Sequence, residues 1–197
     1  YEIVDNAVDE HLAGFCTEIH VTLEKDGSAT ISDNGRGVPV GMHAKGVSAE
    51  RIVYTTLHAG GKFDDSAYKT SGGLHGVGSS VVNALSAYMD VQVSRDGYIH
   101  HDRYERGIPV VELEDGLLPT LGKTRKTGTK VNFLPDDTIF EKTKFKAEEV
   151  KSRMHETTYL NPNLTIIFED LRDTEPEHIV YHEPDGILGF IRELNAK

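Results

Sequence analysis

The first stretch of the chain, EIVDNAVDE at residues 2–10, has the spacing of an amphipathic helix. At about 100° per residue, its apolar side chains fall on one side and its acidic and amide side chains on the other. The apolar side consists of Ile3, Val4, Ala7 and Val8, and the polar side of Glu2, Asn6, Asp9 and Glu10. On this pattern alone, the simplest interpretation is a surface helix whose acidic side meets water.

Strand patterns and helical patterns alternate along the rest of the chain. Apolar residues alternate on both sides of Asp26-Gly27, which predicts a β-hairpin, and Asp96-Gly97 marks a second one. Residues 112–128 have no regular pattern and are predicted to be a loop. The remaining strands are expected at GTKVNFLP, LTIIFED and HIVYHE, and the remaining helices from Ser48 to Gly60, around 81–85, near 146–158 and from about Asp185. Hairpins interleaved with helices indicate an α+β sandwich.

The composition is that of an ordinary globular protein, for which we predict one domain spanning residues 1–197. A formal net charge of −11 should repel a phosphate backbone, so strong direct DNA binding is not expected. No apolar run reaches the length of a membrane span, and Cys16, the sole cysteine, cannot form an internal disulfide. The single cysteine fits a reducing cytoplasm. The chain begins at Tyr1 without a methionine, which we interpret as a fragment of a longer protein.

A glycine-rich stretch, SGGLHGVGSS, runs directly into a predicted helix start. Glycines allow backbone N–H groups to approach phosphate oxygens without a β-carbon in the way, and a helix N-terminus favours negative charge. The spacing fits neither a P-loop nor G-x-G-x-x-G after a strand. The stretch therefore predicts either a polyphosphate cradle of another kind or a flexible surface loop.

A second short motif, DNGRG at residues 33–37, stands at the end of a predicted strand. The carboxylate of Asp33 could accept a hydrogen bond from an exocyclic amine, and Gly35 and Gly37 would let a flat ring pass close to the backbone. Taken alone, DNG is most simply a turn.

In this order, EIVDNAVDE, SDNGRGVP and GGLHGVG, followed by TGT at 127–129, closely resemble the ATPase domain of bacterial type IIA topoisomerases. The match is to the B subunits of DNA gyrase and topoisomerase IV, members of the GHKL superfamily of ATPases. The run LHAGGKFDDSAYKTSGGLHGVGSSVVNALS is far more specific to these topoisomerases than the short motifs are. The resemblance covers essentially the whole chain. It implies a two-layer α/β sandwich of the Bergerat type, with a mixed, mostly antiparallel sheet and helices on one face.

The resemblance implies that the acidic side of the first helix faces a nucleotide. Glu2 would be the general base that activates a water for attack on the γ-phosphorus, and Asn6 would bind Mg²⁺ beside the phosphates. Asp33 would accept a hydrogen bond from the adenine amino group, with assistance from Thr129. ATP and Mg²⁺ are therefore the expected cofactors.

The same resemblance assigns the walls and lid of the pocket. Glu10 would pair with Arg36 beside the adenine, and Gly37 and Pro39 would shape the slot for the ring. The lid is expected to consist of Lys62, Tyr68, Lys69, Gly73, Leu74, His75, Gly76, Val77 and Gly78, and the apolar lining of Ile3, Ala7, Ile31, Val38, Val53 and Val131. Aminocoumarin inhibitors would contact Arg95 together with Asp33, Arg36 and Thr129. Tyr54 stands where the family often carries methionine, so it would narrow the adenine site or change inhibitor preference.

The expected function is that of the ATPase domain of a DNA gyrase B subunit, which couples ATP-driven dimer closure to strand passage and negative supercoiling. The arm that closes the homodimer, the transducer, and the regions that bind DNA and the gyrase A subunit lie outside this sequence. We therefore expect a cytoplasmic monomer that binds ATP but hydrolyses it very slowly.

Other interpretations remain open at this point. The topoisomerase IV B subunit is the main alternative, because the features that distinguish it from gyrase lie mostly in the partner subunit. Another GHKL ATPase and a binding module without catalysis are further alternatives. A metal-dependent hydrolase would need ligands such as His100, His101 and Asp102, or His178 and His182, yet these lack the spacing of a zinc site.

Overall fold

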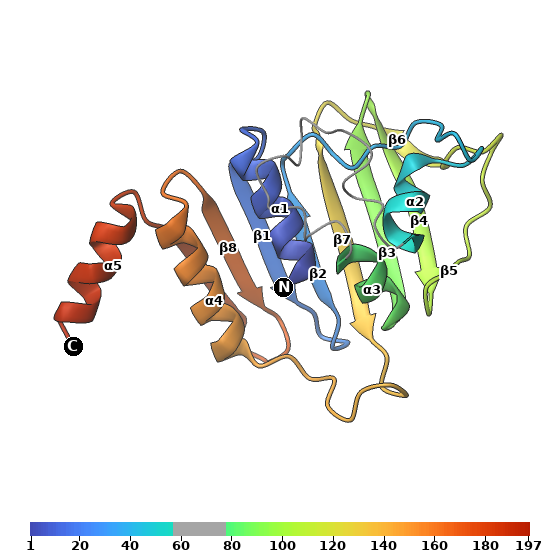
Figure 1. The fold of residues 1–197 in the computed structure, drawn as a ribbon. Coiled ribbons are helices and arrows are strands. Elements are labelled where there is room, and N and C mark those ends of the chain that lie inside the picture. Colours follow the sequence, from blue (N-terminus) through green and yellow to red (C-terminus); the bar gives the residue numbers. More distant parts are fainter. Residues whose placement is uncertain (57–77) are drawn as a thin grey trace.

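The computed structural model describes residues 1–56 and 78–197. In chain order (Figure 1), the elements are α1 (Glu2–Leu12), β1 (Glu18–Leu23), β2 (Ala29–Asp33), α2 (Ala49–Thr55), α3 (Gly78–Ala84), β3 (Ser86–Arg95), β4 (Tyr98–Glu105), β5 (Ile108–Pro109), β6 (Thr120–Lys123), β7 (Gly128–Pro135), α4 (Ala147–Leu160), β8 (Thr165–Asp170), β9 (Glu177–His182) and α5 (Gly186–Asn195).

The strands of the described residues form one nine-stranded sheet in the order β5-β4-β3-β7-β2-β1-β8-β9, with β6 paired to β4. Every pair is antiparallel except β1 with β8, where Glu18 lies opposite Thr165 in a parallel register. Helices α1 to α4 cover one face of the sheet, and α5 lies beyond α4 at the side of the molecule (Figure 1). The predicted mixed, mostly antiparallel sandwich with helices on one face is confirmed.

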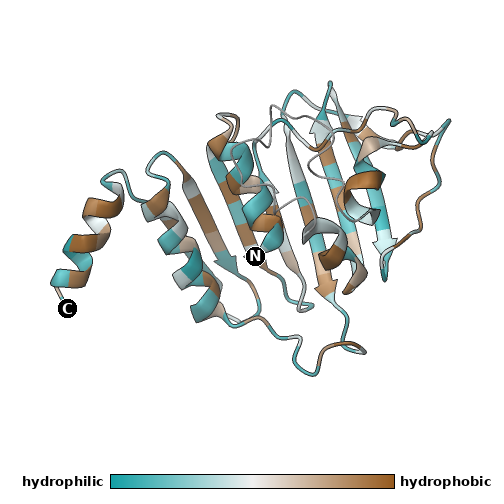
Figure 2. Cartoon of the chain, in the orientation of Figure 1, coloured by the Kyte–Doolittle hydropathy of each residue, from teal (hydrophilic) through white to brown (hydrophobic). Residues whose placement is uncertain are grey.

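The core lies between this sheet and its helices. Every second residue of β1 and of β8 is buried. Figure 2 shows bands of hydrophobic and hydrophilic residues along the strands, with an unbroken hydrophobic stretch in β8. The buried cluster includes Ile19, Val21 and Leu23 of β1, Ile166 and Phe168 of β8, Ile3, Val4 and Ala7 of α1, and Met154 of α4. The apolar side predicted for the first helix therefore packs on the sheet.

The structure confirms both hairpins, and Asp96 and Gly97 at the second turn have positive φ angles of 55° and 87°. The prediction of a loop over 112–128 is wrong in one part, because Thr120–Lys123 forms β6. All four β6 residues are exposed, so no alternation of apolar and polar residues marks this strand in the sequence. The predicted end of the second helix at Gly60 lies outside the described residues.

Within 1–56 and 78–197, no helix combines the length and the apolar character needed to span a membrane.

Candidate functional site

A cavity opens between α1, α2, α3 and the strands β2 and β7. Its lining residues are Ile3, Asn6, Glu10, Ile31, Asp33, Gly37, Val38, Pro39, Val53, Tyr54, Ser79, Thr129 and Val131. Asn6 and Glu10 of α1 thus face a cavity, and Asp9 beside them is buried. The interpretation of α1 as a surface helix whose polar side meets bulk water is wrong for these residues. Ala7, predicted to line the site, is buried in the core instead.

Asp33 lies at the end of β2, on the cavity wall. Its Oδ1 accepts hydrogen bonds from the backbone N–H groups of Gly35 at 2.8 Å and Thr129 at 3.4 Å. Burial raises the pKa of Asp33 to about 6, and these two hydrogen bonds only partly offset that effect. The result is a largely buried carboxylate that is still ionised at neutral pH and is suited to accept a hydrogen bond from an amine.

Glu10 and Arg36 form the ion pair predicted between them. The guanidinium donates to Glu10 Oε1 through Nη2 at 2.8 Å, and the Arg36 backbone N–H donates to Oε2 at 3.0 Å. The guanidinium carbon also lies 3.9 Å from the centre of the Phe15 ring, a cation–π contact. These contacts join the loop after β2 to the C-terminal half of α1 and close one side of the cavity.

The loop at residues 36–40 is held by two further contacts. Thr129 Oγ1 accepts the backbone N–H of Val38 at 3.0 Å, and Arg95 Nη1 donates to the backbone carbonyl of Gly37 at 2.8 Å. Gly37 has φ +86°, and a β-carbon there would lie 3.0 Å from Val93 Cγ1, so the turn favours glycine. Arg95 anchors this loop from β3 and is not among the residues that line the cavity.

Glu2 and Asn6 both meet the start of α3. Gly78 lies so close to Glu2 that a β-carbon on the glycine would sit 2.9 Å from Glu2 Cβ and would overlap the carboxylate. Asn6 Nδ2 donates to Ser79 Oγ at 2.5 Å. Ser79 is a site residue that was not predicted, although it directly follows the predicted glycine-rich lid.

Several predicted site residues fall outside the part of the chain that the structure describes. These are Lys62, Tyr68, Lys69, Gly73, Leu74, His75, Gly76 and Val77. Of the remaining candidates, Asn6, Glu10, Asp33, Gly37, Pro39 and Thr129 share the cavity. Glu2, Arg36, Gly78 and Arg95 are not among the lining residues. Arg36 and Arg95 contact the lining residues Glu10 and Gly37, and Glu2 and Gly78 lie against each other.

The histidines offer little support for a metal-dependent hydrolase. Among the described residues, no group of three or more His, Cys, Asp or Glu side chains is placed to hold a metal ion. Neighbouring residues of β4 take different partners: His101 Nε2 contacts Asp90 Oδ2 at 2.9 Å, whereas Asp102 pairs with Arg51. His178 lies beside Glu169.

Comparison of the sequence with known protein families identifies the family to which the chain belongs. Residues 1–139 match the profile of the histidine kinase-, DNA gyrase B- and HSP90-like ATPases, which covers well over half of the chain. The chain belongs to this ATPase family.

Relatives within this ATPase family include both kinds of type IIA topoisomerase B subunit. The chain is 50% identical over 198 residues to the B subunit of DNA topoisomerase 4 from Enterococcus faecalis, covering 100% of the chain and 28% of that protein. It is 52% identical over 195 residues to the B subunit of DNA gyrase from Archaeoglobus fulgidus, covering 99% and 30%. The chain thus spans less than a third of these relatives. Their names confirm the resemblance stated from the sequence motifs.

A solved structure of the same family has the same fold. The 43K ATPase domain of Thermus thermophilus gyrase B, in complex with an aminocoumarin, superposes with a TM-score of 0.83 at 39% identity. The match covers 98% of this chain and 47% of that one.

Proposed function

We propose that this chain is the ATP-binding and ATP-hydrolysing part of a type IIA topoisomerase B subunit. The proposal depends on one observation: Asn6, Glu10, Asp33 and Thr129 line the same cavity. The Asp33 carboxylate, suited to accept a hydrogen bond from an amine, therefore lies in one cavity with the polar side of α1. Membership of an ATPase family supports ATP as the ligand.

In this proposal the adenine lies against the apolar wall near Asp33, and its amino group donates to the Asp33 carboxylate. Ile31, Val53 and Val131 would contact the faces of the ring. Gly37 and Pro39 would border the slot, and Thr129 would hold the loop that carries them. The residues 62, 68, 69 and 73–78 would close over the phosphates.

Glu2 would act as the general base for hydrolysis. Its carboxylate is half-buried next to the start of α3, in the same region as Asn6. A carboxylate in that position can accept a proton from a water aligned with the γ-phosphorus, a contribution of about 10²–10⁴-fold to the rate.

Asn6 fits a role in holding Mg²⁺. Because its amide nitrogen donates to Ser79, the amide oxygen is left for a hard cation that retains waters and phosphate oxygens as its other ligands. When bound, the ion would neutralise charge on the phosphates.

The whole protein would be a DNA gyrase B subunit, with topoisomerase IV as the alternative. Gyrase and topoisomerase IV relatives match at nearly the same identity, so the 197 residues favour neither kind strongly. We infer a cytoplasmic enzyme that binds the gyrase A subunit and DNA through other regions and closes as a homodimer through an N-terminal arm. Supercoiling by the reconstituted enzyme would indicate gyrase, and decatenation without negative supercoiling would indicate topoisomerase IV.

The ATPase proposal is tested by comparing the wild type with Glu2→Gln. A calorimetric titration with a non-hydrolysable ATP analogue should show similar affinities for both, stronger with Mg²⁺ than without it. Turnover of ATP, measured on the full-length subunit, should fall about 100-fold or more in the variant. Equal losses of binding and turnover would instead assign Glu2 a structural role, and no binding to the wild type would refute the proposal.

A further inference from the structure

A buried polar cluster joins α2 to β4 beside the cavity, and no sequence motif marks its residues. Glu50 of α2, and Asp102 and Tyr104 of β4, are each 0% exposed. The Tyr104 hydroxyl donates to Glu50 Oε1 at 2.9 Å. The guanidinium of Arg51 donates to both oxygens of Asp102, at 2.9 and 3.2 Å.

The two carboxyl groups of this cluster are supported very unequally. Asp102 receives the bidentate Arg51 guanidinium and the backbone N–H of Arg103 at 2.8 Å, which are the partners that an ionised carboxylate needs. Glu50 accepts one hydrogen bond, from the Tyr104 hydroxyl to Oε1. Its Oε2 is buried, and no donor in the described part of the chain reaches it. A second buried charge with so little compensation would be very costly, so the neutral acid is the stable form of Glu50.

The pKa values of the cluster agree with this assignment. Burial and the neighbouring Asp102 carboxylate raise the pKa of Glu50 well above its usual range. Burial opposes ionisation of Asp102 too, but hydrogen bonds from Arg51 and Glu50 outweigh it and lower the pKa of Asp102. The groups that face Glu50 are Arg51 from its own helix and Asp102 and Tyr104 from β4.

The cluster is connected to the cavity through Tyr54. The Tyr54 and Tyr104 rings lie with centres 6.1 Å apart at an angle of 45°, and Tyr54 lines the cavity next to Val53. At the other end of α2, Asn83 Nδ2 of α3 donates to the backbone carbonyl of Tyr54 at 2.9 Å. Glu50 at the start of α2 and Asn83 at its end therefore both fix the helix that carries this wall.

We propose that Glu50 is a positioning residue for the nucleotide pocket: as a neutral carboxylic acid between Tyr104 and Asp102, it fixes α2 and places Tyr54 and Val53 against the purine. The proposal rests on the proposed function of the cavity as an ATP site. Glu50 does not touch the nucleotide in this arrangement and acts through Tyr104 and the helix.

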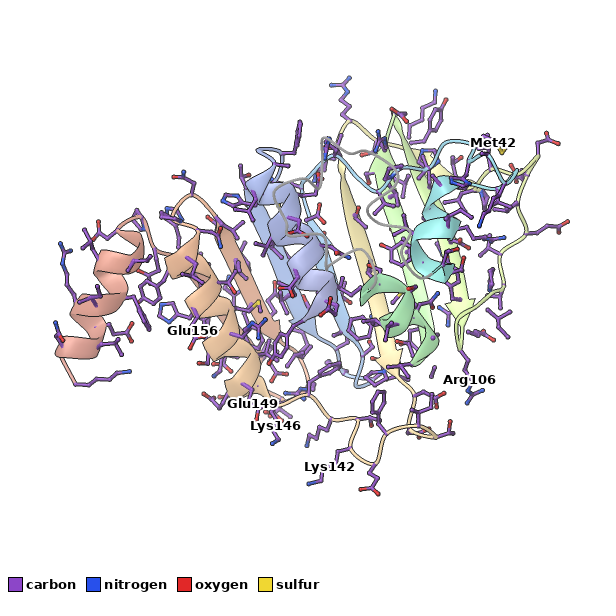
Figure 3. The ribbon with its side chains drawn as sticks, viewed as in Figure 1. Met42, Arg106, Lys142, Lys146, Glu149 and Glu156 are labelled. Carbon is purple, nitrogen blue, oxygen red and sulfur yellow. The ribbon has the colours of Figure 1, made fainter. Side chains whose placement is uncertain are left out.

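The test compares Glu50→Gln and Glu50→Ala with the wild-type protein. Gln is neutral, can accept from Tyr104 through its oxygen, and can donate to Asp102 through its nitrogen. We expect Glu50→Gln to bind a non-hydrolysable ATP analogue within about threefold of the wild type, and Glu50→Ala to bind about tenfold more weakly or worse. Asp136→Asn is the matched control, since it alters a buried carboxylate that pairs with Arg106 at the far end of β7, where Arg106 projects away from the helices (Figure 3). This control should leave affinity unchanged.

The protonation state of Glu50 has its own readouts, which do not depend on nucleotide binding. A carboxyl group whose pKa is raised on folding stabilises the protein below its unfolded pKa, and this stabilisation is lost as pH rises through the folded pKa. The unfolding equilibrium constant of the wild type should therefore increase with pH relative to that of Glu50→Gln, by as much as about tenfold per pH unit. An infrared difference spectrum at pH 7 should show the carbonyl stretch of a protonated carboxyl group in the wild type alone.

Three results would overturn the proposal: no protonated-carboxyl band, a pH-independent difference between wild type and Glu50→Gln above pH 6, or equal ATP-analogue affinity in Glu50→Ala and wild type. If the wild type fails to bind the analogue while the infrared and pH results hold, the proposed function fails and the protonation of Glu50 stands. If Glu50→Ala does not fold, Glu50→Gln and the infrared spectrum still decide the protonation state of Glu50. In the affinity comparison, Glu50→Asp, whose side chain is one methylene shorter, then replaces Glu50→Ala.

Discussion

Gly78, the first residue of α3, lies directly against the side chain of Glu2, the first residue of α1. No side chain separates the two helix starts at this point, and any substituent on Gly78 would displace the Glu2 carboxylate. The position proposed for the general base is therefore set partly by a residue without a side chain.

Gly78→Ala should impair hydrolysis more than binding. The added methyl group would move Glu2, and a shift of about 1 Å in a catalytic group can cost on the order of 100-fold in rate. We expect steady-state ATP turnover of the full-length subunit to fall about 10- to 100-fold, with the affinity for an ATP analogue reduced less. Gly122→Ala is the control, because a β-carbon at Gly122 meets nothing within 4 Å. Unchanged turnover in Gly78→Ala would contradict the role of this contact.

The affinity for ATP should depend on pH through Asp33. The pKa of Asp33 is raised to about 6 in the folded protein, whereas an amine of the ligand needs the ionised form. Between pH 7 and pH 5 the ionised fraction falls about tenfold, so analogue affinity should weaken by a similar factor. Titration calorimetry at several pH values measures this, and Asp33→Asn should bind weakly with a flat profile. If the affinity of the wild type does not change between pH 5 and 7, the ionised Asp33 carboxylate does not take part in binding the adenine.

Asp33→Asn should also stabilise the protein at neutral pH. Because folding raises the Asp33 pKa from 3.8, its contribution to stability is present below pH 3.8 and is lost as pH rises through about 6. At pH 7 the buried charge therefore opposes folding by as much as about 3 kcal/mol. Thermal unfolding at pH 7 should show a higher midpoint for the variant, and the gain should shrink toward pH 4. A lower midpoint at pH 7 would show that hydrogen bonds to the carboxylate outweigh its burial.

Arg95→Ala should weaken aminocoumarin binding. The Arg95 guanidinium is one-third exposed and holds the carbonyl of Gly37 at 2.8 Å, on the loop that borders the cavity. Since a gyrase B relative of the same fold binds an aminocoumarin, we expect a novobiocin-like compound to bind here and to lose about tenfold in affinity in the variant. The exposed Arg125 provides the control, and Arg125→Ala should leave the affinity for the aminocoumarin unchanged. An equally large loss of ATP-analogue affinity would indicate that Arg95 acts only through the loop.

Phe168→Ala tests how much the packing of β8 contributes to the stability of the fold. Phe168 is 0% exposed on β8, opposite Val21 of β1, so truncation should leave a cavity and lower the free energy of unfolding by about 3–5 kcal/mol. Chemical denaturation measures the change. Val180→Ala on β9 is the control, because that side chain is 55% exposed and should cost little. A loss below 1 kcal/mol would mean that β8 packs only loosely.

Periodicity predicted most of the architecture because its elements are half-buried. In β1 and β8 burial alternates residue by residue, and α1 buries one side. By contrast, β6 is exposed throughout and β5 has two residues, so neither leaves a pattern to detect. The parallel pairing of β1 with β8 could not be predicted from the sequence pattern either, because its register depends on contacts between residues far apart in the sequence.

The motifs predicted several residues that share the cavity, but they did not predict all of the contacts around it. The Glu10–Arg36 pair came from the family resemblance and is present in the structure. Ser79 was missed because a serine after glycines carries no specific signal. The cluster around Glu50 could not be foreseen, because a glutamate in the first turn of a helix is normally exposed and its burial depends on Tyr104, more than fifty residues away.

The parallel pairing of β1 and β8 imposes an order on biosynthesis. As the chain leaves the ribosome, β1 can find β2 at once, but its other edge stays unpaired until Thr165–Asp170 has been translated. During that interval the backbone of β1 is open to pairing with other nascent chains. Chaperone capture or aggregation of ribosome-bound intermediates should therefore decline once β8 has emerged.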